Sequence, residues 1–518
     1  MARPVFNVWN RDHLFSLRPL GLLSACVVGL LAMVTATRAT ANQLPAPPAP
    51  VQGAAGTEVS VGGDAETLLR GPIHEAFATQ VGPNPEALLV APKAPPDPIS
   101  EVPPDSRPRG NNISWIPGYS AWDEHREDFI WVSGVWRTVP PGRRWVPGYW
   151  DKAEGGWRWH GGAWVRAEAE AIGYLPPPRQ SLEQGPSSPS PSTNHFWVPG
   201  SWDHREGQYH WRTGFWAEGR PGWCWIPEHY IWSPRGVLRV DGYWDYELAA
   251  RGTLFAPVAL GHHAGARADF RYTPHVIVDP AKIFLHLFVR PGYRHYYFGD
   301  YYGDASVQAG IHPWHEFRTV QRGVDPLLSY YVWNHARQGI NLVDRLTGWH
   351  SHFLATAALR PPHTLAAVGD FVALNRTVAH VDRAVLGQPL RDVLATADGA
   401  TRFVGVTAGE LTQLTKTVES IHRLADLRRG IEAGALAGDV VPGAVQGVVG
   451  ASAEAVPVLK LPAAVQPLHG VAPGLLPTVP GVEGTLPRAL PAVPPVERVL
   501  PVEPPVPLLQ DVPGGLLN

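Results

Sequence analysis

The sequence predicts a mainly β protein in which Trp-rich antiparallel hairpins are followed by a small β/α region and helices. The first observation is the pattern W-x-x-G-x-W, which recurs every 14 residues in two cassettes between Trp115 and Trp244. Self-similarity at a fixed period is typical of repeat architectures. The second observation is that Pro-rich stretches of low charge flank these cassettes, and such composition disfavours a packed core.

Five copies of the pattern are perfect: Trp131–Trp136, Trp145–Trp150, Trp159–Trp164, Trp197–Trp202 and Trp211–Trp216. Imperfect copies are Trp115–Tyr119, Trp225–Tyr230 and Arg239–Trp244, and Glu228 replaces the Gly of the second of these. Acidic turns alternate with Pro-Gly turns between the copies, so the repeat unit is predicted to be a 28-residue hairpin, present four times. Aromatic and β-branched residues dominate the other positions, as expected for strands.

Within one copy the two Trp lie five residues apart, so on a regular strand they face opposite sides unless the Gly forms a bulge. In either case the Gly leaves room for an indole from the facing strand to lie over bare backbone. We therefore expect a structural role, as turn residues, for seven glycines: Gly118, Gly134, Gly148, Gly162, Gly200, Gly214 and Gly242.

The N-terminus has the order of a secretory signal peptide. Three Arg precede an apolar run, Leu20–Val34, and small residues end at Ala41. This predicts export to the periplasm, cell envelope or exterior. Two alternatives stay open, both of which would attach the chain to a membrane: an uncleaved segment acting as an anchor, or lipidation of Cys26.

Composition changes along the chain predict nine segments. They are a signal peptide (1–41), a Pro-rich linker (42–110), the first cassette (111–173), a Pro/Ser tether (174–194), the second cassette (195–250), a β-rich segment (251–304), a His-rich helical segment (305–385), an amphipathic helix (386–435) and a Pro/Val/Gly-rich disordered tail (436–518). Gly71–Phe77 is a candidate short helix inside the linker. Segment 251–304 could complete the sheet that the repeats begin.

Two helices are expected after the cassettes. Asp325 and Pro326 open one that runs to about Leu346. Apolar residues spaced by three and four over 411–425 predict an amphipathic helix, which as a coiled coil would form a homo-oligomer.

Seventeen of the 21 Trp lie between Trp115 and Trp244, and two interpretations of them stay open. They are the apolar core of small sheets that hold few aliphatic residues, or they form a platform for a cell-wall polysaccharide. The candidate ligand-binding residues are Trp131, Trp136, Trp145, Trp150, Trp159, Trp164, Trp197, Trp202, Trp211 and Trp216.

No catalytic residue, cofactor or metal site is predicted. A net charge of −3 does not favour nucleic acid. Two His pairs, His312 with His315 and His350 with His352, lack the H-E-x-x-H pattern, so an unrecognised metal-dependent hydrolase is a secondary alternative. Cys224 lies between two Trp and is interpreted as a small buried residue.

The cassettes resemble the YXWGXW-type repeats of exported bacterial envelope proteins, on the evidence of Trp131-Val-Ser-Gly-Val-Trp136 and Trp145-Val-Pro-Gly-Tyr-Trp150. The flanks, Gly71–Phe77 and Tyr297–Tyr302, are similar to secreted planctomycete-like proteins. The family carries no assigned activity, so the resemblance carries over no functional residue. From the repeats, the N-terminal segment and the low-complexity arms together we expect a non-enzymatic, exported structural or scaffolding protein, with cell-wall polysaccharide or envelope proteins as partners. The Tyr before the motif is mostly absent here.

Overall fold

The computed structural model describes residues 65–261, 270–317, 323–378, 381–433 and 458–463. These residues belong to one compact unit, Val59–Asn518. The predicted signal peptide, Cys26 and most of the predicted tail lie outside the described residues. The described part is mainly β, with many small antiparallel hairpins, which confirms the fold class at this level.

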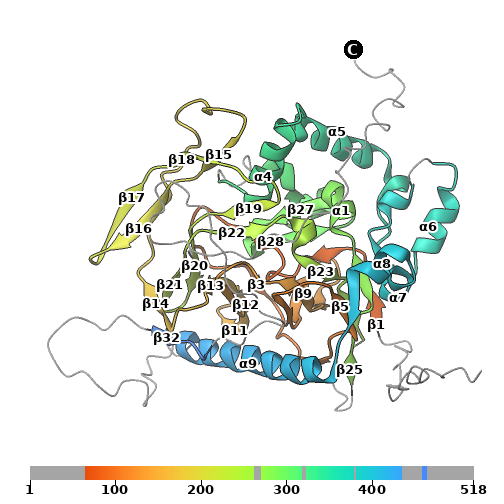
Figure 1. The fold of residues 1–518 in the computed structure, drawn as a ribbon, viewed down its shortest axis with the longest axis horizontal. Coiled ribbons are helices and arrows are strands. Elements are labelled where there is room, and N and C mark those ends of the chain that lie inside the picture. Colours follow the sequence, from red (N-terminus) through yellow and green to blue (C-terminus); the bar gives the residue numbers. More distant parts are fainter. Residues whose placement is uncertain (1–64, 262–269, 318–322, 379–380, 434–457, 464–518) are drawn as a thin grey trace, which may run out of the picture. The chain divides into compact units, whose positions relative to one another are not determined.

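Four hairpins contain the Trp motifs (Figure 1). The first comprises β6 (Ile113–Ile116), β7 (Tyr119–Asp123), β8 (Asp128–Val132) and β9 (Val135–Thr138); the second β10 (Arg143–Val146), β11 (Tyr149–Ala153), β12 (Gly156–His160) and β13 (Ala163–Arg166); the third β15 (His195–Val198), β16 (Ser201–Arg205), β17 (Gln208–Arg212) and β18 (Phe215–Glu218); the fourth β19 (Trp223–Ile226), β20 (His229–Ser233), β21 (Gly236–Val240) and β22 (Tyr243–Tyr246).

All four hairpins share one pairing scheme. The two inner strands pair with each other, as β7 does with β8, and the two outer strands pair with each other, as β6 does with β9. Each hairpin is therefore one long antiparallel ribbon with a break in its middle. The Pro-Gly turns follow the expected chemistry, because Gly142 (φ 65°) and Gly222 (φ 83°) have the positive φ that favours glycine.

Further strands extend three of the hairpins. On the first, β23 (Gly252–Phe255) pairs with β9 and β24 (Val258–Leu260) pairs with β8. On the second, β3 (Val90–Ala91) pairs with β12, and on the fourth, β14 (Ala171–Leu175) pairs with β21. Segment 251–304 thus completes a sheet that the repeats begin. Among the described residues, no strand extends the third hairpin.

The remaining strands are β1 (Ala65–Thr67), β2 (Gly71–Pro72), β4 (Ser100–Glu101), β5 (Ser106–Pro108), β25 (Arg271–Tyr272), β26 (Val276–Val278), β27 (Leu287–Arg290), β28 (His295–Phe298), β29 (His312–Pro313), β30 (Gly387–Pro389), β31 (Phe403–Gly405) and β32 (Val458–Lys460). The helices are α1 (Pro280–Ile283), α2 (Asp304–Gln308), α4 (Pro326–Ala336), α5 (Leu342–Ala355), α6 (Val368–Leu374), α7 (Leu390–Leu394), α8 (Ala397–Arg402) and α9 (Ala408–Ala433). Segment 386–435 therefore holds two short helices and two strands besides the expected amphipathic helix.

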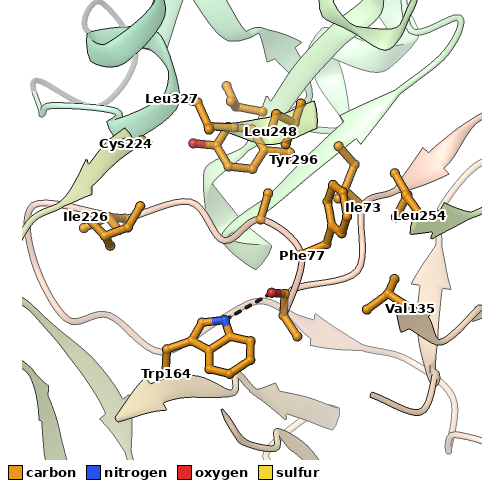
Figure 2. Packing of buried hydrophobic residues seen from close by; sticks show 14 of the residues in the cluster. Ile73, Phe77, Val135, Trp164, Cys224, Ile226, Leu248, Leu254, Tyr296 and Leu327 are labelled. Atoms are coloured by element: carbon orange, nitrogen blue, oxygen red, sulfur yellow. Dashed lines mark hydrogen bonds between the residues drawn. The ribbon is translucent and has the colours of Figure 1, made fainter. Parts of the chain in front are cut away.

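The prediction of a solvated linker is wrong for residues 68–81, most of which are buried. Leu69, Ile73 and Phe77 are fully buried, and Ile73 and Phe77 lie in the largest hydrophobic cluster, between Val135 and Leu254 on one side and Tyr296 on the other (Figure 2). Proline favours an extended chain, but an extended chain with apolar side chains can pass through a core if its carbonyls find donors. Here the Ala76 carbonyl accepts from Trp164 Nε1 at 3.1 Å (Figure 2). It also accepts from Arg137 Nε at 2.8 Å.

The short helix expected at Gly71–Phe77 is absent. Gly71 and Pro72 form β2 and pair with Phe298 and Tyr297 of β28. A single turn follows, closed by the Phe77 N–H that donates to the His74 carbonyl at 2.8 Å. Pairing with β28 stabilises the extended form of a segment too short to be helical alone.

A buried ionic network lies beside this segment. Arg137 Nη2 of β9 donates to both oxygens of Asp245 on β22, at 2.5 and 2.6 Å, and Arg251 Nη2 lies 3.2 Å from the same carboxylate. All three side chains are at most 3% exposed. The network joins the first hairpin to the fourth, and Arg251 also donates to the Phe77 carbonyl at 2.9 Å.

Two segments expected to be free chain are anchored. Tyr174 and Leu175, at the start of the predicted tether, belong to β14, and Tyr174 is 2% exposed. Residues 458–460, within the predicted tail, form β32 on the other edge of β14, with Leu459 fully buried. Short runs with apolar residues, such as Ile172, Tyr174 and Leu175 of β14 or Leu459 of β32, can pair at a sheet edge despite Pro-rich surroundings, which explains both differences.

The helix expected from Asp325 to Leu346 is two helices. Asp325 caps α4 as expected, because its carboxylate accepts from the Leu328 N–H at 2.8 Å. The helix ends at Ala336, Gly339 takes a positive φ of 74°, and Asn341 caps α5. A glycine with this conformation ends a helix, so the continuous prediction fails at that point.

Helix α9 contains the predicted 411–425 helix and is longer at both ends. It packs against β6, β10 and β11 of the first two hairpins, burying Leu414 and Leu424, whereas Leu411 of the expected seam is 45% exposed. The apolar face on which a coiled coil would depend is thus covered by strands of the same chain. Homo-oligomerisation through this helix stays an untested prediction.

Candidate functional site

The break in each hairpin is the common structural feature of the repeats. Two facing dipeptides leave the strand ladder, each ending at the motif glycine or its substitute: 117–118 with 133–134, 147–148 with 161–162, 199–200 with 213–214, and 227–228 with 241–242. The seven glycines expected as turn residues all lie in these breaks. Backbone N–H groups at a break have no ladder partner, so they need another acceptor.

An indole covers each motif glycine. A Cβ built on Gly162 would lie 2.3 Å from Cζ2 of Trp145, and one on Gly148 would lie 2.4 Å from Cζ2 of Trp159. The other pairs place Trp115 over Gly134, Trp131 over Gly118, Trp197 over Gly214, Trp211 over Gly200 and Trp225 over Gly242, at 2.5, 2.6, 2.4, 2.5 and 2.5 Å. The expectation that glycine makes room for a cross-strand indole is confirmed.

The indoles also face one another across each ribbon. The first Trp of one copy is directly opposite the second Trp of the facing copy, as in Trp145 with Trp164 and Trp150 with Trp159. Ring centroids lie 5.2 and 5.6 Å apart in these two pairs. The two Trp of one copy thus lie on consecutive strands separated by the break.

A glutamate from outside the repeat occupies the break of the first hairpin, a site that we call the glutamate seat. Glu101 accepts from the Gly118 N–H at 2.7 Å, the Gly134 N–H at 2.9 Å and Trp131 Nε1 at 2.9 Å. Both unpaired glycine N–H groups and the covering indole therefore share one carboxylate.

The same arrangement recurs on the second hairpin. Glu75 accepts from the Gly162 N–H at 3.0 Å and from Trp159 Nε1 at 3.1 Å, and the Gly148 N–H also contributes to its stabilisation. On the third hairpin Glu183 accepts from the Gly200 N–H and from Trp197 Nε1 at 3.0 Å. The predicted tether, which carries Glu183, is therefore held against the third hairpin.

Burial raises the pKa of both Glu75 and Glu101 to about 7, although hydrogen bonds to the ionised form oppose this shift. Neither carboxylate has an ion-pair partner of its own in the described part of the chain. Desolvation therefore outweighs the donors of the seat.

In the fourth hairpin an ion pair replaces the glycine and the indole. Glu228 stands where the motif has Gly, and Arg239 stands where the facing copy has Trp. Arg239 Nε lies 2.7 Å from Glu228 Oε1, and Arg212 Nη2 of the third hairpin lies 3.0 Å from Glu228 Oε2. The two departures from the motif therefore compensate each other in space.

Helix α9 closes the second break from the opposite side. Arg428 Nη1 donates to the Pro147 carbonyl at 2.9 Å and the Gly161 carbonyl at 2.8 Å, while its Nε donates to Glu432 at 2.8 Å. Tyr149 and Tyr174 donate to the same carboxylate at 2.6 and 2.7 Å. Glu75 thus accepts hydrogen bonds from the N–H groups of this break, and Arg428 donates to its carbonyls.

The candidate ligand-binding Trp fall into two groups by exposure. Trp131, Trp136, Trp159 and Trp164 are at most 5% exposed, so they contribute to the core. Trp145, Trp150, Trp197, Trp202, Trp211 and Trp216 are half-buried, and four of these six lie on the third hairpin. A solvent-open hollow adjoins that hairpin and is lined by Trp202, Trp211, Tyr230, Glu183 and Glu228.

The histidine pairs are split by the fold. His315 lies beside His350, with ring centroids 5.8 Å apart, and burial lowers the pKa of His315 to about 4. Among the described residues, no three His, Cys, Asp or Glu side chains come close enough to hold a metal ion. Cys224 is fully buried, as expected, and burial raises its pKa to about 12.

Sequence reasoning missed the glutamates of the seats as well as Arg428 and Glu432. Their partners are largely backbone groups, which have no side-chain signature in a sequence. The one available signal was Glu75 itself, an acidic residue within the apolar run Ile73–Ala78.

No family model, curated protein or solved structure matches the chain. Within the part of the chain that is described, no helix combines the length and apolar character that crossing a membrane requires.

Proposed function

We propose that this chain is a non-enzymatic structural or scaffolding protein of the cell envelope, exported by its N-terminal segment, whose four hairpins are copies of one 28-residue repeat. The observation that carries the proposal is the shared use of the motif. In each hairpin, motif residues cover a glycine of the facing strand, and in three of them they also bind a glutamate of the same chain. In the imperfect fourth hairpin an ion pair replaces one Trp–Gly contact.

A motif used in this way builds a framework. Most indoles of the first, second and fourth hairpins bury apolar surface, and each buried Trp removes about 150–250 Å² from water. The seats tie distant chain segments to the ribbons. The resemblance of the repeats to exported envelope proteins and the order of residues 1–41 support the location.

Fractionation of a bacterium that produces the full chain tests this proposal. We expect the protein in the envelope fraction, with an intact mass that lacks residues 1–41. A variant with Leu22→Arg and Leu31→Arg in the apolar run should stay in the cytoplasm at full mass. Cytoplasmic retention of the native chain with an intact N-terminus would overturn the proposal.

A second candidate function is polysaccharide binding at the third hairpin. The observation that favours it is the grouping there of four half-buried indoles, two of which, Trp202 and Trp211, line the hollow. Aromatic rings with a few polar groups are typical of ligand sites. The purified full chain should then bind insoluble cell-wall polysaccharide saturably.

A matched pair of variants tests the second candidate. Trp202 and Trp150 occupy equivalent motif positions on the third and second hairpins. Trp202→Leu should lower the affinity at least about tenfold, because an indole stacking contact is lost. Trp150→Leu should leave binding unchanged, with circular dichroism used to verify both folds. Equal binding by both variants would contradict this function.

A further inference from the structure

The third hairpin differs from the others at the outer edge of β17. On the second hairpin, Trp157 and Arg158 pair with Ala91 and Val90 of β3. These are the two residues before the first Trp of the second motif copy. On the fourth hairpin the two residues at the same positions, Val237 and Leu238, pair with Leu175 and Tyr174 of β14.

The corresponding residues of the third hairpin are Tyr209 and His210. Among the described residues no strand pairs with them on that side, because β16 and β17 form a two-stranded sheet. Tyr209 is half-buried and His210 exposed. In Figure 1 these strands form the yellow ribbon at the left of the view.

The backbone of Tyr209 is oriented for pairing. Arg205 and Gln208 close the two-residue turn of this hairpin, so the pair next to them, His204 with Tyr209, is the non-hydrogen-bonded type. The N–H and C=O of Tyr209 therefore point away from β16. Proteins usually protect such an edge with Pro or Lys, and β17 (Gln208–Arg212) has neither.

The occupied edges show which chemistry this edge accepts. In both, the paired residues are two extended residues followed directly by proline: Val90-Ala91-Pro92 and Tyr174-Leu175-Pro176. The residue before the proline pairs with the residue that lies two positions before the start of the second motif copy. A Val/Leu-rich run from the C-terminal part of the chain, β32, already supplies one edge strand in this molecule.

We propose that the outer edge of β17 binds Val496–Pro501 of the same chain as an added antiparallel strand. The register of the occupied edges places Leu500 opposite Tyr209 and Val499 opposite His210. Glu497 is then opposite Arg212, which gives a cross-strand pair of opposite charge. The runs Val482–Leu486 and Leu508–Val512 also precede a proline, but they would place the poor strand formers Gly484 opposite Trp211 and Asp511 opposite His210.

The chain between the last described residue and this segment is long enough. An extended proline-rich chain spans about 3.1 Å per residue, so residues 464–495 reach up to about 100 Å. Docking of this segment would extend the third hairpin by a strand, as the second and fourth hairpins already are.

Amide hydrogen exchange of the full chain, resolved to single residues, tests this docking. We expect the Tyr209 amide of the native chain to exchange at least about tenfold more slowly than that of a Val499→Asp, Leu500→Asp variant. The control Val512→Asp should leave Tyr209 protected. The Trp157 amide, on the occupied edge of the second hairpin, should stay protected in all three proteins.

Equal exchange of Tyr209 in the native chain and the double variant would overturn the proposal. Protection that rises with protein concentration would also overturn it, because the occupant would then be a second copy. Protection of Tyr209 that is independent of concentration and lost only in the double variant supports the proposed segment.

Discussion

At the residue scale, space rather than backbone conformation requires glycine at the breaks. None of the seven motif glycines has a positive φ, whereas the turn glycines Gly142 and Gly222 do. The motif glycines are constrained by the indole that lies over each of them. The pattern W-x-x-G therefore reflects a contact between two facing strands. The Trp and the Gly of each contact come from different copies of the pattern.

Two neighbouring glycines provide a test of this constraint. A Cβ on Gly162 would lie 2.3 Å from Trp145, whereas the nearest atom to a Cβ on Gly161 is 3.5 Å away, an ordinary contact. We expect Gly162→Ala to lower the free energy of unfolding by about 1–3 kcal/mol through overpacking, and Gly161→Ala to change it by less than about 0.5 kcal/mol. Urea unfolding followed by Trp fluorescence measures both, and equal effects would show that space is not the constraint.

Residue-level prediction from sequence succeeded where side chains interact with side chains or with bare glycine. The Trp–Gly contact and the burial of Cys224 follow from residue type and spacing. The seats did not, because Glu101 is an isolated acidic residue whose main partners are two backbone N–H groups. A sequence pattern contains no mark of backbone N–H groups left unpaired by a break 17 and 33 residues away.

At the element scale, the broken hairpin is the unit that tolerates substitution, provided that both halves of a contact change together. Glu228 and Arg239 illustrate this, since an ion pair occupies the positions of a glycine and an indole. The sequence showed both departures from the motif but not that the two residues face each other. Their pairing required the register of β20 and β21.

A double-mutant cycle tests whether the exchange is compensatory. Glu228→Gly alone removes the carboxylate that Arg239 and Arg212 share, and Arg239→Trp alone places an indole against the Glu228 side chain. Each should destabilise the protein. The double variant recreates the common motif. Its loss of unfolding free energy should therefore be smaller, by about 1–3 kcal/mol, than the sum of the losses in the two single variants, as measured by urea unfolding. Additive effects would mean that the two positions are independent.

For longer elements too, the sequence predicted the element but not the residues that it packs against. The spacing of apolar residues predicted α9, and Asp325 marked the start of α4. The partners of these helices lie on strands far away in the sequence, so no local pattern identified them. The packed part of the predicted linker, residues 68–81, was missed because the proline content of the linker describes an extended backbone equally well whether that backbone is in solvent or in a core.

At the scale of the whole molecule, buried titratable groups govern the response to acid. Burial lowers the pKa of six histidines to about 3 or 4: His74, His160, His229, His286, His295 and His315. The unfolded chain binds their protons below pH 6.5, so their contribution to stability is lost as the pH falls from 6.5 towards 4. Burial raises the pKa of Glu75 and Glu101 to about 7 and of Asp325 to about 6, and these groups act in the opposite direction.

The histidines outnumber the three carboxyl groups, so we expect the free energy of unfolding to fall between pH 6.5 and 4.5. One net proton corresponds to about 1.4 kcal/mol per pH unit, which gives an upper bound of about 4 kcal/mol per unit. Urea unfolding at several pH values measures the slope. Glu101→Gln removes one opposing group and should make the loss steeper, whereas stability that rises on acidification would contradict this assignment.

The second break has a consequence for when the protein can fold. Arg428 donates to the carbonyl of Pro147, 281 residues earlier, and to that of Gly161, while Glu75 occupies the other side of the same break. A ribosome must therefore release helix α9 before the second hairpin can close around its partners. Until then the nascent chain lacks the contacts that close this break, so folding is completed only after α9 has been synthesised.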